Sequence, residues 1–356
     1  MKKEAIVTGL DIGSSRISAV AALIGSGGAL DVLAQSSQGS RGISRGAVVS
    51  LSEAVKSVSG VMNKICAKIP RKPGDIYVNI SGESIKGGVS RGMIPLSSRG
   101  REITGPDMAR CVNAAGTIRL SFDREIVHKI VQRFSVDDEP PIKNPLGLYA
   151  SRLACEAYII TANANHIQNI YKCVNNAGYD IKEIVFTGIA DGSSLLTGEE
   201  REEGALLLDM GASLTEASVF ADGTLADLEV ILIGGEDIKG GFKDSPEFSD
   251  IIARVKSKLE NLSASGKKIR AITITGGISF NDGIVEFLEE KLAYPVRMGV
   301  AKEVRGEVSG LDSVRLSTAI GLARYAREKC FKKTREEENL IGRLSAAVTD
   351  IFNNYF

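Results

Sequence analysis

The chain has 356 residues, 43% of them hydrophobic and 25% charged, which is enough for two globular domains, or three, with a sizeable core. Its 44 basic and 44 acidic residues balance, and only 5% of residues are aromatic, which argues against a nucleic-acid-binding protein. Five scattered cysteines and two histidines exclude a zinc ribbon or a disulfide framework and indicate a reducing compartment. The first apolar run ends at Asp11, too early for a signal peptide, so we expect a cytoplasmic protein.

One sequence pattern occurs twice. Val7–Leu23 reads VTGLDIGSSRISAVAAL, and Ala205–Ala221 reads ALLLDMGASLTEASVFA. Each copy has an apolar strand that ends in Leu-Asp-x-Gly, then small residues, then a second strand. A further strand follows each copy, so each predicts the start of a β-meander and the two together predict a duplicated fold.

The turn after each repeated strand suits an anionic ligand. Asp11 corresponds to Asp209, and Gly13 corresponds to Gly211. Glycine permits close approach of the backbone, whose N–H groups in a tight turn can face an anion, and a carboxylate at a strand end can hold hydrated Mg²⁺. One such turn is typical of a plain hairpin, whereas two that face each other would hold the phosphates of a nucleotide between two domains. The predicted phosphate-binding residues are Gly13, Ser14, Ser15, Gly211, Ala212, Ser213 and Thr215, and the predicted Mg²⁺ residues are Asp11 and Asp209, both acting through water.

A third segment fits the same ligand. Lys268–Ile274 predicts a short buried strand, and Gly276 and Gly277 follow it. Glycines after a strand let a ligand lie against the backbone. The stretch Asp282–Leu292 then predicts a helix. Alone this is a simple strand-to-helix turn; beside the two repeats it is a candidate adenosine loop.

These three segments resemble the phosphate-1, phosphate-2 and adenosine loops of the actin, Hsp70 and sugar-kinase superfamily. Within it the chain is similar to the FtsA family of bacterial cell-division proteins over nearly its whole length. The long block Ile167–Gly211 carries most of this resemblance, and Gly42–Val55, Asp75–Ile85 and Arg91–Gly116 add to it. The resemblance implies an α/β protein with the duplicated actin-like (ribonuclease H-like) fold, two halves around a nucleotide cleft, and ATP and Mg²⁺ as ligands.

The resemblance also divides the chain. It implies a first half (1A) at residues 1–82 and 163–200, an inserted FtsA-type 1C subdomain at 83–162, a second half (2A) at 201–235 and 270–328, a reduced 2B subdomain at 236–269, a charged linker at 329–338 and an amphipathic C-terminal helix at 339–356. Within the insertion, Gly105-Pro106-Asp107 predicts the start of a helix. The periodicity of Asp123–Phe134 does not decide between helix and strand.

Three departures from the family pattern concern the ligand site. The second turn lacks two glycines that are usual in the family and has Leu214 where a hydroxyl is common, and Ile278 replaces a third glycine of the adenosine loop. The chain between Gly235 and Ile272 is too short for a full 2B, which in the family borders the nucleotide and binds the C-terminal peptide of FtsZ. We interpret Glu247–Leu262 as a helix that packs over the sheet.

The end of the sequence has helical periodicity. Its apolar residues lie on one face of a helix: Leu340, Ile341, Leu344, Ala347, Val348, Ile351, Phe352 and Tyr355. FtsA proteins end in a similar helix that lies in the membrane interface, and the physics of a terminal amphipathic helix agrees. The alternative is a helix docked on its own domain or on a partner.

Five further polar residues have a structural and a functional interpretation. Glu199 and Glu200 predict a solvated turn, although the resemblance makes them weak candidates for orienting an attacking water. Asp191 predicts either a helix N-cap or a cleft residue. We expect His166 to be a surface or capping residue and His128 to have a structural role.

Together these features predict an actin-like cell-division protein that binds ATP, self-associates and tethers an FtsZ-type filament to the inner face of the cytoplasmic membrane at the division site. Other division proteins would contact 1C, and the reduced 2B affects the implied FtsZ contact. The alternatives are a nucleotide-degenerate FtsA- or PilM-like scaffold, and an active ATPase or sugar kinase of the same superfamily. We find no general base within a substrate-binding constellation, so the protein would be at most a weak ATPase.

Overall fold

The computed structural model describes residues 5–24, 30–70, 72–117, 120–308 and 310–330. Residues 331–338 of the predicted linker and the predicted helix at 339–356 therefore lie outside the described residues. Within the described part of the chain, no helix is long and apolar enough to cross a membrane.

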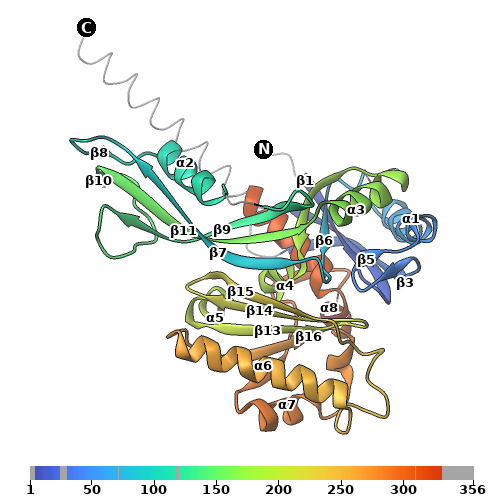
Figure 1. The fold of residues 1–356 in the computed structure, drawn as a ribbon. Helices are drawn as coiled ribbons and strands as arrows, with labels where there is room; N and C mark the ends of the chain where they lie inside the picture. Colours follow the sequence, from blue (N-terminus) through green and yellow to red (C-terminus); the bar gives the residue numbers. More distant parts are fainter. Residues whose placement is uncertain (1–4, 25–29, 71, 118–119, 309, 331–356) are drawn as a thin grey trace.

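Two sheets of the same basic topology form the centres of the two halves (Figure 1). The first comprises β1 (Ala5–Ile12), β2 (Arg16–Ile24), β3 (Leu30–Gly39), β6 (Asp75–Ile80), β12 (Ile181–Phe186) and β18 (Val304–Gly306). The second comprises β13 (Ala205–Met210), β14 (Thr215–Ala221), β15 (Thr224–Ile231), β16 (Ala271–Thr275) and β17 (Val296–Met298). The strand orders are β12-β6-β1-β2-β3-β18 and β15-β14-β13-β16-β17. Each sheet has an antiparallel three-strand meander followed by two parallel strands, which confirms the predicted duplication.

Helices cover both faces of the first sheet. The crossover helix α1 (Leu51–Lys68) buries Val58, Val61 and Ile65 against one face, beside α3 (Ala164–Asn176). The helical residues 317–330 cover the other face. Gly9 permits this contact, because a side chain there would meet the Ala319 carbonyl oxygen at 2.0 Å.

The segment after β17 returns to the first half, whereas the sequence-based boundary assigned all of 270–328 to the second. β18 pairs in parallel with β3. The helical residues 317–330 bury Ala319, Ile320 and Ala323 against the first sheet. Local periodicity predicts that such a helix is buried but cannot tell which of two similar sheets it covers.

The second half has a single long crossover helix. α6 (Pro246–Ala264) joins β15 to β16, as α1 joins β3 to β6, and it starts with Ser245, whose hydroxyl accepts from Phe248 N. Its apolar face is buried on the second sheet together with α7 (Ile284–Leu292), which confirms the interpretation of a packing helix. The reduction of 2B is therefore extreme, because the helix between residues 236 and 269 is the regular crossover helix of the half.

The insertion, predicted at residues 83–162, is an α+β unit that projects to the left in Figure 1. Its elements are β7 (Lys86–Pro95), β8 (Arg101–Glu102), α2 (Gly105–Ala115), β9 (Arg124–Val136), β10 (Tyr149–Ala150) and β11 (Arg152–Asn163). The main sheet has the order β7-β11-β9, so the undecided segment Asp123–Phe134 is mostly strand. α2 begins at the predicted residue, with a capping box between Thr104 and Asp107.

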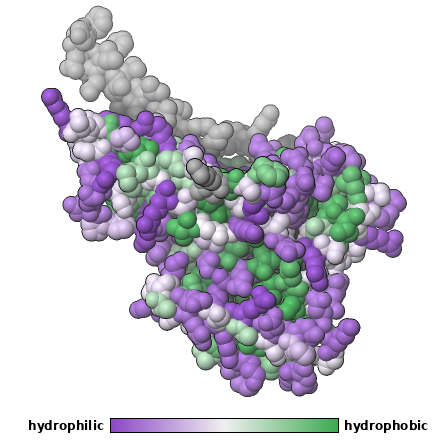
Figure 2. All heavy atoms as spheres, viewed as in Figure 1, coloured by the Kyte–Doolittle hydropathy of each residue, from purple (hydrophilic) through white to green (hydrophobic). Residues whose placement is uncertain are grey.

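The base of the insertion also contacts the second half. Tyr158 on β11 is buried, and its hydroxyl lies 3.1 Å from Asp227 Oδ1 and accepts from Leu228 N at 3.0 Å. Asp227 in turn pairs with Lys258 of α6 at 2.7 Å. Hydrophobic residues gather on the face drawn in Figure 2 where the upper and lower parts of the molecule meet, and one apolar cluster contains residues of both halves.

The remaining short elements are β4 (Ile43–Ser44), β5 (Ala47–Val48), α4 (Thr187–Leu195), α5 (Gly198–Glu203), η1 (Gly277–Phe280) and α8 (Leu311–Arg315).

Replacing Tyr158 tests whether this contact stabilises the fold. Tyr158→Phe removes a buried hydroxyl that bonds to two groups of β15, so we expect the free energy of unfolding to fall by about 1–2 kcal/mol. Urea denaturation followed by circular dichroism measures it. Tyr149→Phe is the control, because Tyr149 is 77% exposed and should change the stability very little. Equal stability of the Tyr158 variant and the wild type would contradict the expectation.

Candidate functional site

The two repeated turns open into one cavity between the halves, with a volume of about 410 Å³. They have the same geometry, because Gly13 N donates to Arg16 O at 3.0 Å and Gly211 N donates to Leu214 O at 2.9 Å. Neither Ala212 nor Ser213 has a positive φ, so the loss of two family glycines does not strain the second turn. The cavity is lined by Asp11, Gly13, Ser14, Ser15, Asp209, Gly211, Ala212, Ser213, Gly276 and Gly277, all of which the sequence analysis singled out.

Thr215 is the predicted phosphate-binding residue that does not line the cavity. Its side chain is fully buried, and its hydroxyl donates to Ile233 O at 2.9 Å. Thr215 is the first residue of β14, where it pairs with Met210 of β13. Its hydroxyl therefore stabilises the loop after β15 and does not face the cavity in this structure.

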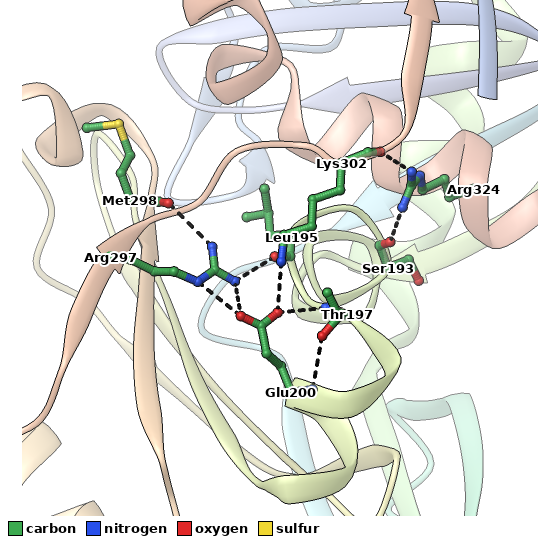
Figure 3. A network of polar contacts seen from close by, with 8 residues as sticks. All are labelled: Ser193, Leu195, Thr197, Glu200, Arg297, Met298, Lys302 and Arg324. Atoms are coloured by element: carbon green, nitrogen blue, oxygen red, sulfur yellow. Dashed lines mark hydrogen bonds and ion pairs between the residues drawn. The ribbon is translucent and has the colours of Figure 1, made fainter. Parts of the chain in front are cut away.

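Glu199 and Glu200 lie on α5, outside the residues that line the cavity. Figure 3 shows Glu200 at the centre of a polar network, where it accepts from Thr197 N and pairs with Arg297 at 2.7 Å and Lys302 at 3.2 Å. Partial burial opposes its ionisation, but these bonds lower the pKa of Glu200 to about 2. Glu200 thus connects α5 to the segment around β17, Glu199 is exposed, and neither residue lines the cavity.

Two half-buried carboxylates, Asp11 and Asp209, line the cavity. Burial, with the charge of Asp209 next, raises the pKa of Asp11 to about 7, although Asn79 donates to Asp11 Oδ1 at 2.9 Å. Burial raises the pKa of Asp209 to about 6. Asn79 also accepts from Ile12 N at 2.7 Å, so it fixes the end of β1. Sequence analysis missed Asn79, and its signal was an amide within the apolar run of β6.

Two further acids lie behind this pair. Glu216 is opposite Asp209 in the β13–β14 register and is 1% exposed. Asp191 is fully buried within α4 and accepts from Thr318 Oγ1 at 2.8 Å, so it is neither an N-cap nor a lining residue. Burial first, and Asp209 next, raise the pKa of both groups well above the usual range. These shifts favour the protonated, neutral forms of both acids, which lie outside the cavity lining.

The loop after β16 also lines the cavity. Gly276 and Gly277 follow β16, and a side chain at Gly276 would meet Asp209 Oδ1 at 2.5 Å, whereas one at Gly277 would enter open space. Phe280 lies beneath the guanidinium of Arg315, 5.3 Å from its ring centroid, and both line the cavity. Ile278 is buried in the core of the second half, which explains why glycine is not needed there.

Both histidines are buried. His128 accepts from Phe186 N at 2.9 Å, which confirms the structural role, and burial, with Lys329 next, lowers its pKa to about 3. His166 is 8% exposed, so the prediction of a surface residue is wrong. Burial lowers the pKa of His166, although its bond to the Gly46 carbonyl oxygen opposes this shift.

The residues fit a phosphate ligand with a hydrated cation. Two turns present small residues and backbone to the cavity, and a divalent cation would relieve the repulsion between Asp11 and Asp209. Arg16 and Arg315 add positive charge to the lining. In the described residues, no group of three or more His, Cys, Asp or Glu side chains is arranged to ligate a metal.

Comparisons with known proteins identify the family. The chain is 30% identical to the cell division protein FtsA of Borreliella burgdorferi over 95% of both chains. It belongs to the FtsA family. It is 26% identical to FtsA of Pseudomonas aeruginosa, over 91% of this chain and 90% of the relative, and 25% identical to FtsA of Escherichia coli, over 96% and 94%. The family described as the SHS2 domain inserted in FtsA matches residues 82–161, which include almost all of the insertion.

Solved structures show the fold. The chain resembles the PilM-PilN type IV pilus biogenesis complex, with a TM-score of 0.67, 15% identity and coverage of 91% of this chain and 98% of that one. It resembles the ethanolamine utilization protein EutJ of Carboxydothermus hydrogenoformans, with a TM-score of 0.51, 13% identity and coverage of 90% and 89%. The chain is thus an actin-like cell-division protein with an FtsA-type insertion.

Replacing Asp11 by Asn tests how much the charge of this carboxylate, close to Asp209, lowers the stability of the fold. The folded pKa of Asp11 is about 7 and its unfolded value is 3.8, so protonation of Asp11 stabilises the fold fully below the unfolded value, and this stability is lost as the pH rises through 7. At pH 8 we expect Asp11→Asn to be more stable than the wild type by about 1–3 kcal/mol, and the difference should shrink towards pH 5. Urea denaturation at the two pH values measures this. The control is Asp180→Asn, an exposed carboxylate; a gain for Asp11→Asn that does not depend on pH would contradict the expectation.

Proposed function

We propose that this FtsA-family protein binds ATP with Mg²⁺, self-associates, and links a filament to the cytoplasmic face of the inner membrane at the division site. The observation that supports ATP binding best is that the two repeated turns, one from each half, line the same cavity. Small residues and backbone at both turns provide the donors that phosphate groups need. A volume of about 410 Å³ lies in the range of small-molecule sites.

Each part of the ligand has residues that suit it. The phosphates would lie between Gly13–Ser15 and Gly211–Ser213, and Asp11 and Asp209 would hold Mg²⁺ through water. The cation supplies the positive charge that lets phosphates approach two carboxylates. The base would lie along Gly276 and Gly277, near the Phe280–Arg315 pair.

ATP would act mainly as a conformational ligand. It contacts both halves only when they are close together, so binding favours the closed cleft and shifts the protein to a form that self-associates. The candidate water-orienting residues, Glu199 and Glu200, lie outside the cavity lining, which favours this role over rapid hydrolysis. The unstrained second turn disfavours the nucleotide-degenerate scaffold, and no observation favours a sugar kinase.

The partners follow from the family. An FtsZ-type filament remains the proposed partner, contacted at a surface other than a full 2B, since α6 is the regular crossover helix there. Other division proteins would contact the insertion. The proposed membrane contact uses the apolar face of residues 339–356: Leu340, Ile341, Leu344, Val348, Ile351, Phe352 and Tyr355.

Filling the open end of the cavity tests nucleotide binding. Gly277→Val adds a side chain where no atom lies within 4 Å, so the variant should fold while blocking the ligand, with at least about tenfold weaker binding of Mg-ATP. Isothermal titration calorimetry measures the affinity. Gly88→Val is the matched control, because its added side chain also meets nothing within 4 Å but lies on β7, away from the cavity lining. A wild-type protein that binds no Mg-ATP would refute the proposed ligand.

Deleting the tail tests membrane tethering. Removal of residues 339–356 takes away the apolar face of the predicted helix, so binding to vesicles of bacterial lipids should fall at least about tenfold. Co-sedimentation with liposomes measures this, and replacing Leu344 and Phe352 by Glu in the full chain is the matched variant that keeps the length. Equal co-sedimentation of the wild type and both variants would exclude the tail as the tether.

A further inference from the structure

A two-residue hairpin tip contacts both repeated turns. Arg45 and Gly46 join β4 to β5 and have φ values of +47° and +76°, which suit a tight hairpin turn. Gly46 N donates to Ser14 Oγ at 3.2 Å, and Arg45 N donates to Ser213 Oγ at 3.2 Å. Adjacent N–H groups of one tip therefore bond to the first turn, in the same half, and to the second turn, across the cavity.

The tip leaves both serine hydroxyls able to donate to a ligand. A hydroxyl that accepts one hydrogen bond retains its own hydrogen. Ser14 and Ser213 both line the cavity, so a phosphate oxygen between the turns can accept from the two hydroxyls while the tip stays bonded to them. When the halves separate, the Arg45–Ser213 bond must break, whereas the Gly46–Ser14 bond lies within one half. The tip thus responds to closure of the cleft.

The tip is packed tightly against the start of the insertion. A side chain at Gly46 would meet the Ser81 carbonyl oxygen at 2.7 Å, and one at Gly82 would meet the Arg45 carbonyl oxygen at 2.7 Å. Closely packed backbones shift together, because no space exists to absorb a displacement of one alone. Movement of the tip is therefore transmitted to residues 81–82, where the insertion begins.

His166 links the tip to both ends of the insertion. Its Nε2 donates to the Gly46 carbonyl oxygen at 3.0 Å, because a carbonyl can only accept, and Nδ1 then accepts from the Ser84 hydroxyl at 2.7 Å. His166 belongs to α3, which follows β11 directly. Ser84 precedes β7, so the two residues flank the points where the chain enters and leaves the insertion.

Arg124 extends this link into the insertion itself. It lies at the start of β9, and its guanidinium donates to Ser84 O at 2.8 Å and to Thr161 O at 3.0 Å. It also donates to Thr161 Oγ1 at 2.7 Å. Arg124 of β9 thus bonds to the segment just before β7 and to β11, which connects the three strands at the base of the insertion.

We infer that the Arg45–Gly46 tip senses a phosphate ligand between the turns, and that His166 and Ser84 transmit this state to the insertion. The inference rests on the proposed binding of a nucleoside triphosphate. Closure of the cleft seats the tip on both turns, and the Gly46–His166–Ser84–Arg124 chain of hydrogen bonds fixes the base of the insertion. The insertion would then present its surface to partners in a position set by the ligand. His166 and Ser84 are positioning residues, since neither lines the cavity.

Hydrogen–deuterium exchange on the full chain tests the link, with Mg-ATP as the probe and Mg-ADP and no nucleotide for comparison. In the wild type, Mg-ATP should slow exchange both at the turns and in β7 and β9 of the insertion. In Ser84→Ala the slowing at the turns should persist, with ATP affinity within about threefold of wild type, while the slowing in the insertion becomes clearly smaller than in the wild type, because only the backbone packing and the Tyr158 contact still connect the insertion to the cleft. His166→Leu, which breaks the link at its centre, should behave in the same way.

Two controls separate a lost link from a damaged insertion. Ser90→Ala removes a hydrogen bond of 2.7 Å to Ala115 O within the insertion, and His128→Gln alters the other buried histidine; both should keep the wild-type response. An insertion response of wild-type size in Ser84→Ala and His166→Leu would overturn the inference. So would a wild type that responds at the turns alone, although ATP binding would then stand. No response anywhere would overturn the proposed ligand and this inference together.

Discussion

The repulsion between Asp11 and Asp209 is the constraint around which the site is organised. Two equivalent strand ends bring their carboxylates into one buried cavity, where burial and mutual repulsion raise the pKa of Asp11 to about 7. Burying carboxylates without a cation nearby lowers the stability of the fold. The packing of the core alone gives no reason for such an arrangement. The apolar clusters that hold the two halves must offset this cost, and a cation with a phosphate ligand relieves it. A strained electrostatic arrangement of this kind is typical of a binding site.

Duplication supplies the symmetry of the site, and sequence differences between the copies break it. The strand positions opposite the two aspartates are Ser18 in the first half and Glu216 in the second. The residues that close the two turns are Arg16 and Leu214. The first turn therefore carries a cation where the second carries an apolar side chain, and the second hairpin carries an extra acid. A ligand held between them meets two chemically different walls.

The parts of the site that the sequence predicted are local ones. An Asp-x-Gly turn at the end of an apolar strand is contained in a few residues, and its repetition indicates that two such turns share a purpose. Thr215 belongs to the same motif but lies outside the cavity lining, because membership of a motif does not say to which side of the strand a side chain points. Asn79 and Arg315 reach the cavity from elements that are far from the turns in the sequence, so no local sequence pattern predicts their presence there. Likewise, the helical residues 317–330 show an apolar face, but only the glycine at position 9 and the pairing of β18 place them on the first sheet.

The insertion limits how the two halves can move relative to each other. The chain crosses between the two sheets after β12 and again after β17, so two chain segments join the halves. The insertion adds a third contact, since Tyr158 bonds to β15, and Asp227 of that strand pairs with Lys258 of α6. Opening of the cleft must therefore break or shift the contact of the insertion with the second half. The insertion is covalently part of one half and hydrogen-bonded to the other, so its orientation cannot be independent of the separation between the two turns.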